Sequence, residues 1–352
     1  MRIVEIGLAV PERAVSQSTF AEWAQDVSKF KGRGERLIPS LYMRSGVDKR
    51  HSVLLEGEPV RQFFFAPAQD ADDRGPTTAD RMWRFERDAT PLALRAAHAA
   101  LGDERAITHL VTVSCSGFSA PGFDLALIKQ LELSPSTERT HVGFMGCHGA
   151  LNGLRVARAI VHADPCARVL LCAVELCTLH YNYGVEVEQI VSNGLFADGA
   201  AALLLEHDDA DTPWRVHASG SYVLPDSESL MTWRVRDHGF EMGLSAEVPA
   251  RIEEHLRGWL DGWLARQGLT RKAIGSWAIH PGGPRILSAV ERALELPPQA
   301  TADSRAVLAA YGNMSSPTLV FILDALRRRD APRPCVALGF GPGLTAEAAL
   351  LL

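Results

Sequence analysis

The sequence predicts a layered α/β fold, and two observations carry that prediction. Short apolar runs rich in Val, Leu and Ala alternate along the chain with longer amphipathic stretches. This alternation is typical of strands that helices cover on both faces. The chain has 352 residues, of which 47% are hydrophobic and 22% charged, so it is long enough for one large domain or two ordinary ones with substantial cores.

The apolar runs are predicted strands and the amphipathic stretches predicted helices. In chain order, the predicted strands are HLVTVSC (109–115), HVGFMG (141–146), ARVLLCAVEL (167–176), AALLLEH (201–207), SWAIH (276–280) and CVALGFG (335–341). The predicted helices are 88–101, 122–132, 148–163, 247–267, 284–294 and 303–329. Strands and helices that alternate in this way predict a layered α/β chain.

Two stretches break the alternation. Residues 56–80 contain EGEPV and APAQDADDRGP and few periodic apolar positions, which predicts a surface loop, with a lid or a partner surface as alternatives. The stretch EHDDADTPW (206–214) carries four acids and a proline between two apolar regions. It is the predicted boundary between an N-terminal half, 1–207, and a C-terminal half, 208–352.

Composition excludes several classes of protein. A formal net charge of −6 argues against a general nucleic-acid binder, because such proteins usually carry a basic face. No apolar run reaches the roughly 20 residues of a membrane span, and the N-terminus lacks a secretory signal, so we expect a cytoplasmic protein. The six cysteines show neither metal-ligand spacing nor the density of a disulfide framework, which favours a reducing compartment and no metal site.

One local charge cluster stands apart from this acidic average. It lies within residues 29–50 and is either a solvated basic surface or a site for a small phosphorylated ligand. Its members are Lys29, Lys31, Arg33, Arg36, Arg44, Lys49 and Arg50.

Cys147 follows a predicted strand and opens a predicted helix in FMGCHGALNG. Unpaired N–H groups and the helix dipole at such a position lower the pKa of a thiol and favour the nucleophilic thiolate. Gly146 and Gly149 leave room for a substrate carbonyl beside the sulfur. A buried, inert cysteine is the alternative interpretation.

His280 ends an apolar strand and is followed by Pro281, Gly282 and Gly283, which stop the strand and open a turn. A histidine there faces a cavity, and an imidazolium is the commonest partner of a catalytic thiolate. A core histidine with satisfied hydrogen bonds is the alternative. We assign Gly282 to the substrate site together with His280.

Asn313 lies in YGNMSSP, where glycine, asparagine and serines interrupt a helix-like pattern. An asparagine amide is a neutral donor, so it suits an oxyanion whose charge appears only during reaction. A helix cap at the turn is the alternative interpretation.

Taken together, these motifs resemble the type III polyketide synthases, the chalcone and stilbene synthase family of the thiolase-like superfamily. The matching segments are GFMGCHGALNGLRVA, SNGLFADGAAALLL, SYVLPDSESLM, WAIHPGGPRIL, YGNMSSPTLVFILDAL and GFGPGLTAEAALL. They run in the family's order from residue 109 to the end, whereas the first hundred residues match loosely. The resemblance implies a thiolase-like α/β fold of two similar halves, with layered α-β-α-β-α architecture, and a homodimer.

The resemblance also implies roles for the three reactive residues. Cys147 matches the nucleophile that takes the starter acyl group from coenzyme A. His280 and Asn313 match the pair that steadies the thiolate, promotes decarboxylation of malonyl-CoA and stabilises the enolate. Malonyl-CoA and a starter acyl-CoA are then substrates, and no bound cofactor is required.

Other positions match the family's substrate-binding residues. Phe196 matches the aromatic gatekeeper between the coenzyme A tunnel and the cavity, and Met242 takes the second gatekeeper position, which is usually aromatic. Arg44 matches a contact to the coenzyme A phosphates, although the neighbouring basic positions of the family fall on Leu37 and Ser40.

The cavity-lining positions depart from the plant chalcone synthases. Cys115 replaces threonine and Trp233 replaces glycine, as in bacterial tetrahydroxynaphthalene synthases. His180 occupies a further lining position, and Ser315 matches a serine behind the nucleophile. Ala120 falls where plant members carry a methionine that crosses into the partner subunit.

These departures argue against a coumaroyl starter and leave two other starters open. Malonyl-CoA as starter and extender fits Cys115 and Trp233 and implies a small polyhydroxylated aromatic or a pyrone. A fatty acyl-CoA starter is the alternative, as in the alkylpyrone and alkylresorcinol synthases. A ketoacyl synthase III, a papain-like hydrolase and an acyl-CoA-binding scaffold without turnover are the competing classes.

Overall fold

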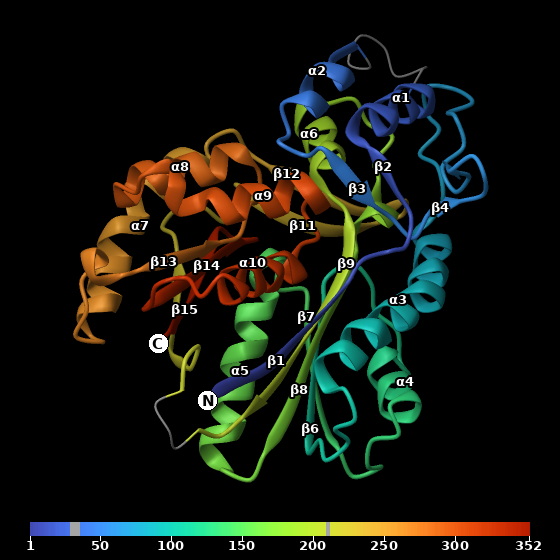
Figure 1. The fold of residues 1–352 in the computed structure, drawn as a ribbon. Coiled ribbons are helices and arrows are strands. Elements are labelled where there is room, and N and C mark those ends of the chain that lie inside the picture. The colour runs from blue at the N-terminus through green and yellow to red at the C-terminus, as the bar shows by residue number, and fades with distance from the viewer. Residues whose placement is uncertain (29–35, 209–211) are drawn as a thin grey trace.

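The computed structural model describes residues 1–28, 36–208 and 212–352 (Figure 1). Two sheets organise the chain. The first has five strands in the order β1-β9-β8-β6-β7, in which β8, β6 and β7 are parallel and β9 and β1 antiparallel to their neighbours. Its strands are β1 (Arg2–Ala9), β6 (His109–Ser114), β7 (Glu138–Gly143), β8 (Arg168–Leu176) and β9 (Asp198–Glu206).

The second sheet has four strands in the order β10-β15-β14-β13. Only β13 and β14 run parallel, and β15 and β10 continue the sheet in antiparallel pairs. The strands are β10 (Val216–Val223), β13 (Ser276–Ile279), β14 (Cys335–Gly341) and β15 (Thr345–Leu351). The chain passes from the first sheet to the second between β9 and β10.

Helices cover both faces of each sheet, and Figure 1 shows the resulting stack. The outer pair α3 (Thr78–Leu101) and α4 (Phe123–Gln130) packs on the first sheet, and α7 (Val248–Ala265) and α8 (Pro284–Leu294) pack on the second. Between the sheets lie α5 (Gly149–Ala163) and α10 (Ser316–Arg328). The five layers α-β-α-β-α confirm the predicted fold class.

The central layer joins the two halves into one core. Val111 and Leu203 of the first sheet, Leu319 of α10, and Ala337 and Ala349 of the second sheet belong to one cluster and are almost fully buried. Both faces of the inner strands β8, β9 and β14 are covered, so these strands are continuous apolar runs, whereas the edge strand β7 is mostly exposed. The similarity of the two halves, divided at residues 207 and 208, stays a prediction.

Shorter elements gather at one end of the molecule, at the top of Figure 1, above the sheets. Three helices, α1, α2 and α6, lie there with the hairpin β11-β12 and the short strands β2 and β3. Their bounds are α1 Gln17–Val27, α2 Ile38–Met43, α6 Val187–Leu195, β2 Ala14–Ser16, β3 Lys49–His51, β11 Met231–Arg236 and β12 Gly239–Leu244. Two-residue strands β4 (Leu55–Glu56) and β5 (Arg61–Gln62) and helix α9 (Ala302–Tyr311) complete the elements that matter below.

Three predicted elements differ in the structure. The strand predicted at 141–146 is β7, Glu138–Gly143, which ends early because Phe144 adopts φ 57°. The helix predicted at 303–329 is two helices, α9 and α10, because Gly312 and Ser315 between them take positive φ. The helix predicted at 88–101 begins at Thr78, because Thr77 and Asp80 form a capping box.

Several antiparallel strands were not predicted from the sequence. Of these, β1, β10 and β15 are the largest. The residues 56–76 are mostly irregular, in agreement with the predicted surface loop. Over the described ranges, which leave out 29–35 and 209–211, no helix is long and apolar enough to cross a membrane.

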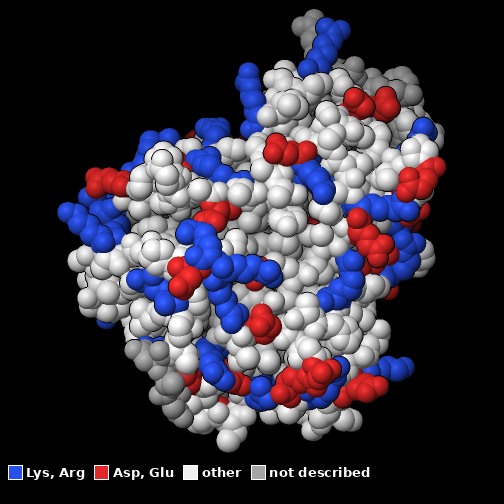
Figure 2. Space-filling view, in the orientation of Figure 1, with Lys and Arg blue, Asp and Glu red and all other residues white. Residues whose placement is uncertain are grey.

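Charge on the surface is mixed. Figure 2 shows Lys and Arg interspersed with Asp and Glu over the face it presents, which is the orientation of Figure 1. Ion pairs such as Arg168 with Glu206 and Arg305 with Glu291 join opposite charges from different elements. This face therefore carries no extended field of one sign.

Candidate active site

Cys147 lies two residues before α5, in the 3-10 turn Gly146–His148 that follows β7. Gly146 has φ 76°, and a Cβ atom there would lie 2.3 Å from Cδ of Pro342. The turn therefore needs glycine to bring the thiol against β14 and its loop. Cys147 is 8% exposed and lines a cavity.

His280 directly follows β13, and its backbone N–H donates to the Leu338 carbonyl of β14 at 2.8 Å. The side chain is 1% exposed. Within the part of the chain that the structure describes, neither ring nitrogen has a hydrogen-bond partner. Buried polar atoms are normally paired, so these nitrogens remain available to a reacting group.

Asn313 lies between α9 and α10, after Gly312 at φ 76°. Its backbone forms two hydrogen bonds to the turn after α6, from its N–H to Leu195 O and from Ala197 N–H to its carbonyl, both at 2.9 Å. Its Oδ1 accepts from the Ser315 N–H at 2.8 Å. The amide also acts to lower the pKa of the Cys147 thiol, which is the effect of a donor, and Nδ2 is the only donor of an asparagine side chain.

Cys147, His280 and Asn313 line the same cavity. They are far apart in the chain, since His280 follows Cys147 by 133 residues and Asn313 follows His280 by 33. Phe196, Met242 and Gly282 line the cavity as well, with six further residues. These are Ser192, Leu195, Met231, Leu244, Ile286 and Phe340. The cavity holds about 30 Å³, the space of one or two water molecules, so a bound acyl chain requires side chains to move.

Burial raises the pKa of the Cys147 thiol to about 11, while hydrogen bonds from Ser315 and Asn313 act in the opposite direction. Burial likewise lowers the pKa of His280 to about 3, and His148 acts in the same direction. The helix N-terminus favours the thiolate, as expected from the sequence, but desolvation acts in the opposite direction and is the larger influence on the resting thiol. With these pKa values the Cys147 thiol and the His280 imidazole are both neutral near pH 7. Transfer of the thiol proton to His280 would give a thiolate and an imidazolium, whose opposite charges stabilise each other.

A second small cavity, of about 20 Å³, lies on the other side of Phe196 and Met242. Trp233 and His180 line it, and the Trp233 Nε1–H donates to the Cys115 carbonyl at 2.7 Å. His180 stacks on Phe240 at 4.0 Å between ring centroids. Its Nε2–H donates to Ser116 O and its Nδ1 accepts from the Phe240 N–H, so the ring is neutral and burial lowers its pKa to about 3.

Cys115 and Ser315 lie behind the nucleophile, outside both cavities. The Cys115 sulfur is 3.4 Å from the Ser315 hydroxyl and donates to Glu175 Oε1 at 3.2 Å. Glu175 is fully buried and also accepts from the N–H and hydroxyl of Ser116 and the hydroxyl of Ser316. Burial raises the pKa of Glu175, and these donors oppose the shift.

Glu175 is a site residue that sequence reasoning missed. The available signal was a single acid near the end of the apolar run ARVLLCAVEL, because a carboxylate in a buried strand needs several donors around it. His148 was missed too. Its Nδ1 contacts Asn152 Oδ1 and its Nε2 contacts Thr345 Oγ1, both at 2.6 Å.

An open groove of about 470 Å³ adjoins the site. It shares Leu195, Leu244, Gly282 and Ile286 with the catalytic cavity. Arg44 and Arg285 line its outer part. The groove thus brings exposed cations to the walls that it shares with the catalytic cavity.

The basic cluster of residues 29–50 divides in the structure. Arg44, Arg36 and Lys49 are exposed, whereas Arg50 is buried and belongs to no surface. Lys29, Lys31 and Arg33 lie outside the described residues. A larger cavity of about 800 Å³ lies at the opposite end of β13 and touches none of the reactive residues.

Comparison with known proteins decides the family. The profile "Chalcone and stilbene synthases, N-terminal domain" matches residues 1–209, and the profile of the C-terminal domain matches residues 215–352. The chain belongs to the chalcone and stilbene synthase family. It is a type III polyketide synthase, and the resemblance inferred from its motifs is confirmed.

This polyketide synthase has curated relatives along its whole length. It is 33% identical over 360 residues to "Alpha-pyrone synthesis polyketide synthase-like Pks18" of Mycobacterium tuberculosis, covering 98% of this chain and 89% of that protein. It is 32% identical to "1,3,6,8-tetrahydroxynaphthalene synthase" of Streptomyces peucetius, covering 99% and 92%. The crystal structure of PKS-I from the brown alga Ectocarpus siliculosus superposes with a TM-score of 0.90 at 28% identity, covering 99% of this chain and 97% of that one.

Proposed function

We propose that this polyketide synthase builds its product from malonyl-CoA at Cys147, with His280 and Asn313 as its catalytic partners. The observation that carries the proposal is the convergence of the three side chains on one cavity at the inner end of an open groove. A nucleophile, a proton acceptor and a neutral oxyanion donor are the groups that acyl transfer requires.

The first step loads the starter. The Cys147 proton passes to His280, and the thiolate attacks the thioester carbonyl of the starter acyl-CoA. The tetrahedral intermediate then expels the coenzyme A thiolate, which takes the proton back from His280. An acyl thioester on Cys147 remains.

The second step extends the chain. Malonyl-CoA loses carbon dioxide, and its electron pair becomes an enolate whose oxygen accepts hydrogen bonds from His280 and from Nδ2 of Asn313. The enolate carbon attacks the acyl thioester and displaces the Cys147 thiolate, so the chain grows by two carbons and the nucleophile is regenerated. A donor to a developing oxyanion is worth about 3 kcal/mol in comparable sites.

A small starter, malonyl-CoA itself, is the proposed primer. The indole of Trp233 is anchored to the Cys115 carbonyl, and the stacked rings of His180 and Phe240 stand beside it. These rings occupy space that a long or aromatic starter would need. The product is then a small polyhydroxylated aromatic or a pyrone, and a fatty acyl-CoA starter is the alternative.

Coenzyme A is proposed to lie in the groove, with its phosphates near Arg44 and Arg285. Both cations line the outer part of the groove, and its apolar wall suits the pantetheine arm. The proposal includes a cytoplasmic location, where all six cysteines stay reduced, since each is a free thiol in the structure.

A second copy of the chain is the proposed partner. Strand β7 is the edge of the first sheet, and most of its residues are exposed. An open edge strand invites pairing with another strand. Phe118, Phe144 and Met145 beside it are 53%, 39% and 38% exposed, so pairing of two β7 strands would also bury large apolar side chains. Ala120 supplies no long side chain to that interface.

The test is incubation of purified protein with malonyl-CoA alone and then with long-chain acyl-CoA, followed by mass spectrometry of the products. Aromatic or pyrone product from malonyl-CoA alone supports the proposal. Product that forms only when a fatty acyl-CoA is added refutes the proposal that malonyl-CoA is the primer. Cys147→Ala should form no product in either case, and undiminished product from that variant would refute the mechanism.

A further inference from the structure

Arg50 of β3 is a buried cation whose hydrogen bonds all go to uncharged oxygens. It is 1% exposed. Its Nε and Nη2 donate to Gln17 Oε1 at 3.0 and 2.8 Å, and its Nη1 donates to Asn193 O at 2.6 Å and Phe196 O at 3.0 Å. The guanidinium lies 3.7 Å from the centre of the Phe20 ring. Burying a charge is costly, so this arrangement needs a reason.

The two carbonyls that Arg50 binds belong to the C-terminal end of α6. Helix ends leave carbonyls without intrahelical partners, and they carry the negative end of the helix dipole. Gln17 serves the same end, because its Nε2 donates to Gly194 O at 2.7 Å. Arg50 and Gln17 together are therefore the C-terminal cap of α6, supplied by distant parts of the chain.

The capped turn is the one that holds Asn313. Leu195 O accepts from the Asn313 N–H, and the Ala197 N–H donates to Asn313 O. Phe196, whose carbonyl Arg50 binds, lies between Leu195 and Ala197 and lines both cavities. A shift of this turn would move the oxyanion donor and the gate together.

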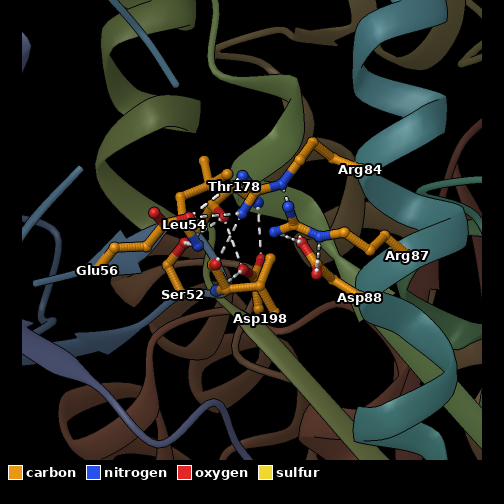
Figure 3. A network of polar contacts seen from close by, with 9 residues as sticks. Ser52, Leu54, Glu56, Arg84, Arg87, Asp88, Thr178 and Asp198 are labelled. Atoms are coloured by element: carbon orange, nitrogen blue, oxygen red, sulfur yellow. Dashed lines mark hydrogen bonds and ion pairs between the residues drawn. The ribbon is translucent and has the colours of Figure 1, made fainter. Parts of the chain in front are cut away.

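Asp198 anchors the same turn from its other end, and Figure 3 shows it beneath Ser52 and Thr178. Its Oδ2 accepts from the Val53 N–H at 2.9 Å and the Thr178 hydroxyl at 2.7 Å, and its Oδ1 accepts from the Thr178 N–H at 2.9 Å. Arg50 and Val53 come from one crossing segment. The segment 50–53 therefore supplies a buried cation, Arg50, that binds carbonyls of the turn 193–198. That turn in return supplies a buried carboxyl group, Asp198, that binds the Val53 N–H.

We propose that Arg50 and Asp198 are positioning residues for catalysis, which hold the turn 193–198 so that the Asn313 amide stays directed at the reacting thioester and Phe196 stays between the cavities. The inference rests on the proposed role of Asn313. Burial lowers the pKa of Arg50 to about 10, so the cation remains charged at the pH of any assay near neutrality.

The test separates two reactions of one site. Decarboxylation of malonyl-CoA needs the Asn313 amide at the enolate oxygen. Alkylation of Cys147 by iodoacetamide instead needs the thiolate, to which Asn313 contributes one hydrogen bond. In Arg50→Lys, a single ammonium cannot reach Gln17, Asn193 and Phe196 together. We expect kcat for carbon dioxide release to fall about 100-fold, the usual effect of a 1 Å misplacement, and alkylation to change less than about fivefold, the value of one hydrogen bond.

Arg81→Lys is the matched control. Arg81 of α3 is also fully buried, and its Nη1 donates to the carbonyls of Leu179 and Tyr181. Burial lowers its pKa to about 10 as well. The substitution should cost similar stability, measured as Tm, and leave carbon dioxide release per folded molecule within about threefold. Equal losses in Arg50→Lys and Arg81→Lys would overturn the inference.

Two further variants keep the outcomes distinct. If Arg50→Lys does not fold, Gln17→Leu tests the same cap of α6, because it removes the hydrogen bonds of Gln17 to Arg50 and to Gly194 O. Carbon dioxide release should again fall, and unchanged release in that variant would overturn the inference. Asn313→Ala is measured in parallel. If Asn313→Ala retains decarboxylation, the proposed function fails, whereas loss in Asn313→Ala with full activity in Arg50→Lys refutes the positioning role alone.

Discussion

Trp233→Ala should widen the range of starters. The indole has three aromatic neighbours, Phe196, His180 and Phe240, with centroids 6.0, 5.5 and 5.8 Å away. The two cavities that flank Phe196 hold about 30 and 20 Å³. Truncation of a single buried leucine in another protein left a cavity of about 150 Å³, so loss of an indole opens space several times that now present.

The same substitution should cost stability. Replacement of a buried Trp by Ala costs about 3–5 kcal/mol, and because Trp233 is only partly buried we take the lower value, about 3 kcal/mol. At about 2 °C per kcal/mol in a chain of this size, the Tm should fall by about 6 °C. Differential scanning fluorimetry measures the shift.

The decisive assay mixes malonyl-CoA with an equimolar series of acyl-CoA starters and ranks the products by mass spectrometry. Trp233→Ala should incorporate longer acyl groups than the wild type. Trp259→Ala is the control, since Trp259 is also partly buried and stacks on Tyr222 and Trp263 of the C-terminal half. An unchanged starter range in a folded Trp233→Ala, or the same broadening in Trp259→Ala, would refute the reasoning.

Three other predictions follow from the geometry. In His280→Ala, alkylation of Cys147 should rise with pH toward the thiol pKa of about 11, whereas the wild type should level off at lower pH because His280 takes the proton; coincident rate profiles would contradict this. Gly312→Ala should lower the free energy of unfolding in urea by about 2 kcal/mol, because φ is 76° and the new Cβ would lie 2.8 Å from Ala197 Cβ. Phe118→Glu should shift the protein from dimer to monomer in light scattering, and an unchanged mass would count against the β7 interface.

Much of the site was predictable because its signals are local. Cys147, His280 and Asn313 each stand beside glycines or prolines at the end of an element, and such punctuation is readable within a few residues. Most predicted strands and helices were likewise found near their expected bounds, because hydrophobic periodicity depends on a short window. The antiparallel strands β1, β10 and β15 were not predicted, since pairing with distant strands decides their place.

The electrostatics of the site could not be predicted in the same way. A helix N-terminus favours the thiolate of Cys147, but burial acts in the opposite direction and raises the thiol pKa to about 11. Burial depends on every element packed around the turn, and no local pattern reports it. Glu175 illustrates the same limit, because its donors come from β6 and its loop and from the start of α10.

Periodicity and short motifs were enough to predict the layered fold and the family, and they single out three candidate reactive residues, because these signals are local in the chain. The surroundings of these residues come from the packing of distant segments. Arg50 reaches Phe196 across 146 residues, and Trp233 reaches Cys115 across 118. Contacts of that span arise from the packing of whole layers, so an arginine that reads as part of a basic surface cluster becomes the buried cap of the turn that holds Asn313.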